Sequence, residues 1–220
     1  MERVPEPELM DAPEQAAAYA QADFEEPNSH FVELFHTYVG RPSGPILDLG
    51  CGPGDIPLRL ARAIPDARID AVDGAAAMLE HARRALAASP DCADRVRFLQ
   101  ATLPDHGLAS GAYQAIVSNS LLHHLHDPSG LWGTVKRVAA PGAGVLVMDL
   151  FRPQDADAAA GIVATYAADE PEVLRRDFYN SLFAAFTPDE VRSQLQRAGL
   201  DSLAVTTVSD RHLLVYGQLP

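Results

Sequence analysis

The sequence predicts a doubly wound α/β fold, with a mostly parallel seven-stranded sheet, a C-terminal antiparallel hairpin, N-terminal helices and a small helical cap. Two observations carry this prediction. Short apolar runs, typical of buried strands, alternate with segments of helical periodicity from residue 46 to residue 150. A chain of 220 residues, of which 47% are hydrophobic, is long enough to bury the core of one such domain.

The N-terminal region is predicted to hold a tail and two helices. Residues 1–13 contain three prolines and several acidic residues, so we expect a flexible tail. Residues 14–40 have a helical pattern, which Pro27-Asn28 is expected to divide into two helices. A single domain is therefore predicted over residues 14–220, with these helices ahead of the sheet.

The middle of the chain alternates strand and helix signals. Because strands and helices of this length take turns, we expect βαβ units and a parallel sheet that helices cover on both faces, a Rossmann-like arrangement. The predicted strands are Ile46–Leu49, Arg68–Val72, Val96–Leu99, Tyr113–Ser118 and Val145–Leu150, and the predicted helices are Ile56–Ile64, Ala75–Ala88 and Leu131–Ala139.

The rhythm changes after the fifth predicted strand. Residues 154–186 have a helical pattern with no strand between, which predicts a helical cap insertion. Residues 187–190 read Thr-Pro-Asp-Glu, the pattern of a capped helix start. Two β-rich stretches, residues 203–208 and 213–217, are joined by the short link Ser209-Asp210-Arg211 and predict the closing hairpin.

A glycine-rich loop follows the first predicted strand, within the run Ile46–Asp55. A dinucleotide site uses Gly-x-Gly-x-x-Gly to seat a pyrophosphate, whereas here the third glycine comes one residue earlier. Asp55, expected to cap the next helix, would repel a phosphate, and Asp48 at the strand tip suits an ammonium group. Asp73 ends the second strand, where a carboxylate can bond both ribose hydroxyls. S-adenosylmethionine (SAM), which has an ammonium group and no phosphate, therefore fits better than NAD.

Four stretches together resemble the class I SAM-dependent methyltransferases, of the small stand-alone type. Their order and spacing carry the resemblance, since no single stretch is unique to the family. It implies a methyltransferase with SAM as its cofactor. The matching stretches are Ile46–Asp55, Ala71–Gly74 with Met78-Leu79, Ala115–Leu125 and Pro141–Asp149.

The resemblance also assigns cofactor contacts to matching positions. The glycine-rich loop would hold the methionine and ribose parts of SAM. The end of the second strand would contact the ribose and the adenine, and the end of the fourth strand would face the reacting methyl group. Where family members usually have an acidic residue after the third strand, this chain has Thr102, whose hydroxyl could accept from the adenine amino group more weakly. The predicted cofactor-binding residues are Asp48, Gly50, Cys51, Gly52, Gly54, Asp73, Gly74, Met78, Thr102, Leu103, Asn119 and Ser120.

Methyl transfer from a sulfonium needs mainly the alignment of the acceptor, so no fixed catalytic dyad is required. His124 is a candidate general base, and the alternative is that it only forms a hydrogen bond with the backbone at a helix start. Asp149 is a candidate to orient the acceptor. No metal site is predicted, because adjacent helical histidines point apart. The predicted substrate-binding residues are Tyr19, Phe31, Arg176, Tyr179 and Asn180, beside the alternative that they only pack or face solvent.

The composition of the chain limits the classes of partner that we expect. With 17 basic and 30 acidic residues the net charge is −13, which disfavours a nucleic-acid partner. Two cysteines, no signal-peptide pattern and no long apolar run predict a cytoplasmic protein without a membrane partner. We expect a monomer or homodimer that methylates an O, N or S atom of a small molecule. A tRNA- or protein-modifying SAM-dependent transferase and a non-catalytic SAM-binding sensor are the alternatives.

Overall fold

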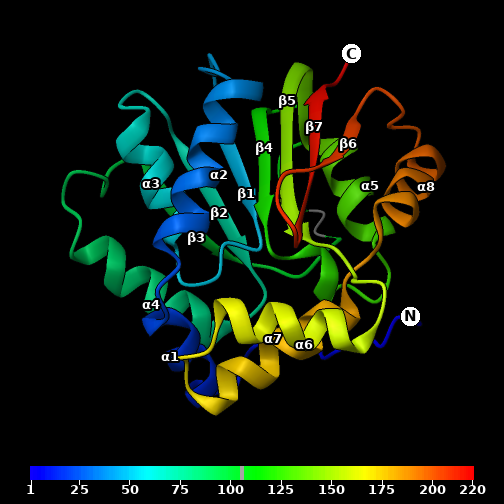
Figure 1. The fold of residues 1–220 in the computed structure, drawn as a ribbon. Coiled ribbons are helices and arrows are strands. Elements are labelled where there is room, and N and C mark those ends of the chain that lie inside the picture. Colours follow the sequence, from blue (N-terminus) through cyan, green and yellow to red (C-terminus); the bar gives the residue numbers. More distant parts are fainter. Residues whose placement is uncertain (105–106) are drawn as a thin grey trace.

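Seven strands form one sheet in the order β3-β2-β1-β4-β5-β7-β6, in a computed structural model that describes residues 1–104 and 107–220 (Figure 1). The first five strands are parallel, and β7 runs antiparallel between β5 and β6. The predicted doubly wound fold with a C-terminal hairpin is therefore confirmed. The strands are β1 Ile46–Leu49, β2 Ile69–Asp73, β3 Val96–Gln100, β4 Tyr113–Asn119, β5 Ala139–Leu150, β6 Ala204–Thr207 and β7 His212–Gln218.

The helices agree with the predicted pattern except near the N-terminus. The break between the first two helices lies at residues 22–24 rather than at Pro27-Asn28. Pro27 is in the first turn of α2, where a backbone N–H has no partner within the helix and its loss costs little. The helices are α1 Pro13–Gln21, α2 Glu25–Tyr38, α3 Asp55–Ala63, α4 Ala76–Ala87, the 3₁₀ turn η1 Leu122–His124, α5 Ser129–Val138, α6 Ala156–Tyr166, α7 Glu172–Ala184 and α8 Pro188–Ala198.

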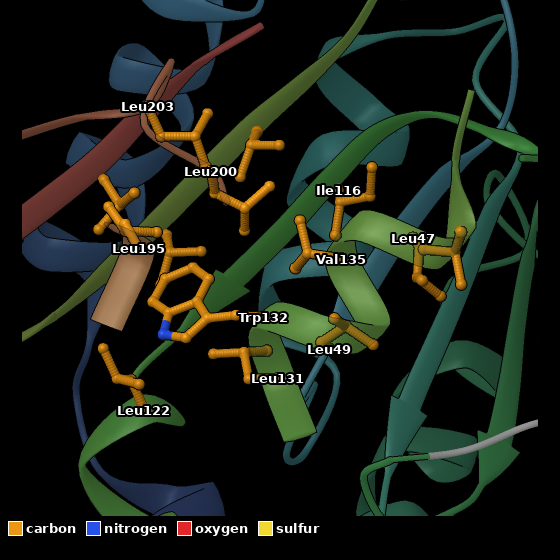
Figure 2. Close-up of a cluster of buried hydrophobic side chains, with 14 of the residues drawn as sticks. Leu47, Leu49, Ile116, Leu122, Leu131, Trp132, Val135, Leu195, Leu200 and Leu203 are labelled. Carbon is orange, nitrogen blue, oxygen red and sulfur yellow. The ribbon is translucent and has the colours of Figure 1, made fainter. Parts of the chain in front are cut away.

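Helices cover both faces of the sheet because successive side chains of a strand point to opposite faces. On one face Leu47 and Leu49 pack with residues of α5 and α8. Trp132 of α5 is 1% exposed within this cluster, and its indole N–H donates to the side-chain oxygen of Gln194 at 2.9 Å (Figure 2). On the other face Ile46 packs with residues of α2 and α3. Both faces of β1 are therefore buried, which leaves its carboxyl end to reach a site.

Three helices lie at the end of the sheet where the parallel strands finish, namely α1, α6 and α7 (Figure 1). The helix that follows them begins as predicted, with a capping box. The Thr187 hydroxyl accepts from the Glu190 amide at 3.2 Å, and the Glu190 carboxylate accepts from the Thr187 amide at 2.7 Å. Among the described residues, no helix combines the length and apolar character that crossing a bilayer requires.

The first twelve residues have no helix or strand, yet they make defined contacts at this end of the sheet. Asp11 accepts from the Ala77 amide at 2.9 Å, at the start of α4. Arg3 lies 3.9 Å over the ring of Phe186. The predicted flexibility of residues 1–13 concerns motion and stays a prediction. The guanidinium of Arg3 also donates to three backbone carbonyls, those of Ala184, His123 and Leu125.

The capping box of α8 gives a test of the fold. We expect Thr187→Ala to lower the free energy of unfolding by about 1 kcal/mol, because the amide of Glu190 loses its acceptor. Chemical denaturation measures this change. Thr165→Ala is the matched control, since Thr165 is an exposed helical threonine that donates only to the Gly161 carbonyl within its own helix. Equal losses in the two variants would contradict a specific role for the cap.

Candidate functional site

A cavity lies at the carboxyl ends of β1, β2 and β4, where the strand order reverses. The loop after β1 and the start of α4 form one side, and α1, α2 and the N-terminal segment form another. The cavity opens to solvent, and its empty volume counted with this mouth is about 1210 Å³. The lining residues are Glu8, Leu9, Met10, Tyr19, Phe24, Asn28, Asp48, Gly50, Cys51, Gly52, Pro53, Asp55, Ile56, Val72, Asp73, Gly74, Ala75, Met78, Ala101, Thr102, Leu103, Asn119, Ser120, Leu121, His124 and Leu125.

The loop after β1 needs its glycines for their backbone conformation. Gly50, Gly52 and Gly54 have φ values of 76°, 51° and 90°, a region that side chains strongly disfavour. Gly54 is also crowded, because a Cβ there would lie 2.7 Å from the ring of Phe98. Gly54 is the cap residue of α3, so the expectation that Asp55 caps this helix is wrong: Asp55 is its first residue.

Asp73 holds this loop against the start of α4. One carboxylate oxygen accepts from the Gly52 amide and the other from the Ala75 amide, both at 2.8 Å. Burial raises the pKa of Asp73 above its ordinary value, although the backbone hydrogen bonds oppose the rise. A single side chain therefore links two loops that lie on either side of the cavity floor.

Asp48 places an unpaired carboxyl group at the cavity. The residue is 1% exposed, and neither side-chain oxygen has a hydrogen-bond partner within the described part of the chain. Burial, with a contribution from the charge of Asp73, raises the pKa of Asp48 to about 8. At neutral pH the group is therefore mostly protonated, and a bound cation would draw it into the ionised form.

Two asparagines form a directed chain of hydrogen bonds along the cavity. The Asp55 carboxylate accepts from Arg59 Nε at 2.6 Å and from Asn28 Nδ2 at 2.7 Å. Because a carboxylate only accepts, Asn28 must turn its nitrogen to Asp55, and its oxygen then accepts from Asn119 Nδ2 at 3.2 Å. The Asn119 side-chain oxygen is left buried without a partner among the described residues.

His123 and Asp149 form a buried pair behind the cavity. His123 Nδ1 lies 2.6 Å from one carboxylate oxygen of Asp149, and the other oxygen accepts from the Leu122 amide at 2.6 Å. Burial lowers the pKa of His123, but the charge and the hydrogen bond of Asp149 outweigh it, so the pKa is raised overall. Asp149 is 1% exposed and is not among the residues that line the cavity. It therefore fixes the turn after β4.

His124 lines the cavity and meets a residue of the N-terminal segment. Its Nδ1 lies 3.2 Å from a carboxylate oxygen of Glu6, which accepts from the Ser181 hydroxyl of α7 at 2.9 Å. Burial, followed by the charge of His123, holds the pKa of His124 well below its usual range. The imidazole is thus neutral at pH 7. Ligand-type atoms of Glu6, His123 and His124 lie within 4.8 Å of one another, and the expectation of no metal stays a prediction.

The structure brings most of the predicted cofactor residues together and separates most of the predicted substrate residues. Of the cofactor set, all but Gly54 line the cavity. Of the substrate set only Tyr19 does. Phe31 is 0% exposed in the core under α2, and Arg176 has a side chain that is 68% exposed. Tyr179 and Asn180 lie on α7 away from the cavity lining, where the Tyr179 ring packs 4.8 Å from that of Phe183.

Sequence reasoning expected the N-terminal helices beside the substrate but did not assign the contacts of Phe24 and of the N-terminal segment. Asn28 and Phe24 line the cavity from the start of α2, and Leu9 reaches the surface of Gly74. Neither an aromatic residue just before a helix nor an apolar residue in a proline-rich tail indicates a cavity contact in the sequence alone. Ser120, which was predicted, has a feature that sequence does not reveal: its φ is 58°, and a strained residue of this kind is typical of a functional site.

Comparisons with known proteins agree with this geometry. A family model described as methyltransferase domain matches residues 46–142. An uncharacterized methyltransferase of Mycobacterium bovis is 32% identical over 57% of this chain and 60% of its own length. A trans-aconitate 2-methyltransferase of Azoarcus sp. is 34% identical over 50% of this chain and 40% of its own length. The chain thus spans 60% and 40% of the lengths of these two curated relatives.

Solved structures share the whole layout at low sequence identity. A SAM-dependent methyltransferase from Aquifex aeolicus superposes with a TM-score of 0.72 over 95% of this chain and 99% of that chain, at 17% identity. At that identity the likeness establishes the fold, which is the class I methyltransferase fold.

The raised pKa of Asp48 predicts a pH effect on the ligand-free protein. Between about pH 4 and pH 8 the carboxyl group of Asp48 is protonated in the folded state and ionised in the unfolded state. Its protonation therefore stabilises the folded state fully below the ordinary carboxyl pKa, and this contribution to the free energy of unfolding is lost as the pH rises through 8. Asp48→Asn cannot ionise. We expect its stability relative to the wild type to rise by roughly 2–5 kcal/mol from pH 4 to pH 8, measured by chemical denaturation.

The exposed Asp66 provides the control for this measurement. Asp66→Asn should follow the wild-type curve across the same pH range. Parallel curves for the wild type and Asp48→Asn would show that Asp48 has no raised pKa in the folded protein.

Proposed function

We propose that this protein, whose residues 46–142 belong to the family of methyltransferase domains, is a methyltransferase that moves the methyl group of SAM to an O, N or S atom of a small molecule. One observation carries the choice of ligand. The buried, unpaired carboxyl group of Asp48 lines the cavity and calls for a cationic hydrogen-bond donor. SAM offers an ammonium group and a sulfonium.

The cavity suits the rest of SAM as well. The backbone of Gly50 and Gly52 provides a surface against which the methionine portion can lie closely. The Asp73 carboxylate accepts from loop amides and offers about four acceptor sites in all, so acceptor capacity remains for the ribose hydroxyls. Gly74, Met78 and Thr102 also line the cavity, and we assign them to the adenine.

When bound, SAM supplies an electrophilic methyl group, and the protein's task is to align the acceptor with it. We assign that alignment to Asn119, the last residue of β4, and to Ser120, which follows it, because both line the cavity. Where the acceptor must lose a proton during attack, the neutral imidazole of His124 is the candidate base. Asp149 acts through His123 and the Leu122 amide, as a positioning residue.

A small, non-polyanionic acceptor in the cytoplasm fits the charge and the cysteines. The net charge is −13, and the cavity has no lysine or arginine among the described residues that line it. A phosphate backbone would find no cation there. Cys51 and Cys92 are both free, as in a reducing compartment.

Incubation with methyl-labelled SAM and a panel of small acceptors tests this function. Transfer of the label to an acceptor, together with calorimetric binding of SAM and none of NADH, is the expected result. Tight SAM binding without transfer to any acceptor would favour a sensor over an enzyme. Binding of NADH would overturn the choice of ligand.

Asp73 gives the corresponding mutational prediction. We expect Asp73→Ala to weaken SAM binding by ~1–3 kcal/mol, about 5- to 150-fold, because the ribose hydroxyls lose their acceptor. Isothermal titration calorimetry measures the affinity, and thermal unfolding verifies that the loop amides released by the change have not unfolded the variant. Asp66→Ala, an exposed control, should bind SAM as the wild type does. Unchanged affinity in Asp73→Ala would refute the assigned role.

A further inference from the structure

We propose that the methyl acceptor is a small amine, which is recognised as a cation and as a hydrogen-bond donor at Asn119. This inference rests on the proposed function and narrows its acceptor to one chemical class. Three independent features of the cavity support it: its charge, the direction of its hydrogen bonds and its aromatic pair.

The first feature is the lack of a basic side chain. No lysine or arginine is among the described residues that line the cavity, whereas four carboxyl groups are, those of Glu8, Asp48, Asp55 and Asp73. Because the proposed function gives Asp48 and Asp73 to SAM and Arg59 neutralises Asp55, Glu8 is the carboxyl group that remains for an acceptor. The nearby guanidinium of Arg59 is already held by Asp55 at 2.6 Å and by Glu25 at 2.7 Å. A carboxylate or phosphate acceptor would therefore be repelled without a compensating partner, whereas a cation would be attracted.

The second feature is the direction of the amide chain. Arg59 holds Asp55 in place, Asp55 fixes the orientation of Asn28, and Asn28 fixes that of Asn119. The chain therefore ends in a carbonyl oxygen, buried and without a partner among the described residues. A buried acceptor of this kind strongly favours a ligand that donates a hydrogen bond over an isosteric ligand that cannot. Asn119 is the last residue of β4, where the proposed function puts the reacting methyl group.

The third feature is a pair of aromatic rings. Tyr19 and Phe24 line the cavity with ring centroids 4.7 Å apart. Aromatic faces attract ammonium groups, most strongly where water is excluded. The pKa of the Tyr19 hydroxyl is raised to about 12 by burial and by the charges of Asp149, Asp73 and Asp55, so the group remains neutral within a negative field. The same field stabilises a bound ammonium ion.

The chemistry balances without a further reactant. The ammonium ion gives one proton to solvent at the open mouth of the cavity, and the resulting amine donates its N–H to Asn119. The amine lone pair forms the new N–CH₃ bond as the bond between methyl and sulfur breaks, and that electron pair stays on the sulfur. The positive charge passes to the nitrogen of the product, which the carboxyl groups stabilise.

Acceptors with one carbon skeleton and different end groups test the proposal. We would compare 2-phenylethylamine, 2-phenylethanol and 3-phenylpropanoate, with trans-aconitate as a polyanion. Binding is measured by calorimetry in the presence of S-adenosylhomocysteine, the demethylated product, and transfer is measured with labelled SAM. We expect the amine to bind at least about tenfold more tightly than the alcohol, and the two anions not to bind.

The outcomes separate the two proposals. If neither SAM nor S-adenosylhomocysteine binds, the proposed function fails. If they bind but the amine binds no better than the alcohol, or an anion is bound or methylated in preference, the amine proposal fails while the proposed function stands.

A variant of α2 tests the amide chain itself. Asn28→Leu is similar in size but cannot orient Asn119, so we expect the binding of the amine, measured in the presence of S-adenosylhomocysteine, to weaken about tenfold. Thermal unfolding and calorimetry with S-adenosylhomocysteine verify that the variant is folded and still binds the nucleoside. Thr37→Ala, an exposed change on the same helix, should leave the binding of the amine as it is in the wild type. Wild-type affinity for the amine in a folded Asn28→Leu protein that binds S-adenosylhomocysteine would overturn the role of the chain.

Discussion

The carboxylate of Asp73 links the two loops on which the cavity depends. Its hydrogen bonds to the Gly52 and Ala75 amides join the segment after β1 to the start of α4. Apolar contacts support both segments, since Cys51 packs with Leu79 and Ala82, and Ala75 packs with Met78. The carboxylate adds a polar link between the two segments, and the glycines leave the loop surface bare for a ligand.

Charge is organised around that link in an unusual way for a protein interior. Asp48 is buried without a partner, which is a cost in the ligand-free protein that a bound cation would remove. Asp55, by contrast, is neutralised by Arg59 and serves to orient two amides. The two aspartates flank the same glycine loop. Asp48 has no partner and can bind a cation, whereas Asp55 is already paired and fixes the orientation of Asn28. Such opposite uses of one residue type are set entirely by the neighbours of each.

The parts of the site that follow strands could be predicted from the sequence, whereas only some of the parts that come from helices could, Tyr19 and Met78 among them. Asp48, Asp73 and Asn119 each end or follow an apolar run, and parallel strands bring such positions to one edge of a sheet. Asn28 and Phe31 lie on one amphipathic helix, where local pattern does not tell which faces a cavity and which a core. The helix places Asn28 at the cavity and buries Phe31 completely. For the same reason the local pattern of α7 did not show that Arg176 is exposed and lies outside the cavity lining.

The two halves of the cavity come from separate stretches of the chain. Asp48, Asp73 and Asn119 lie within residues 46–142, the part that matches the domain family, whereas Tyr19, Phe24 and Asn28 precede it. Substitutions in the first 45 residues can therefore reshape one wall without touching the glycine loop. Evolution can preserve the side of the cavity that comes from residues 46–142 while the side that comes from the first 45 residues diverges between related proteins. For that reason a likeness confined to the domain carries information about the methyl donor and little about what receives the methyl group.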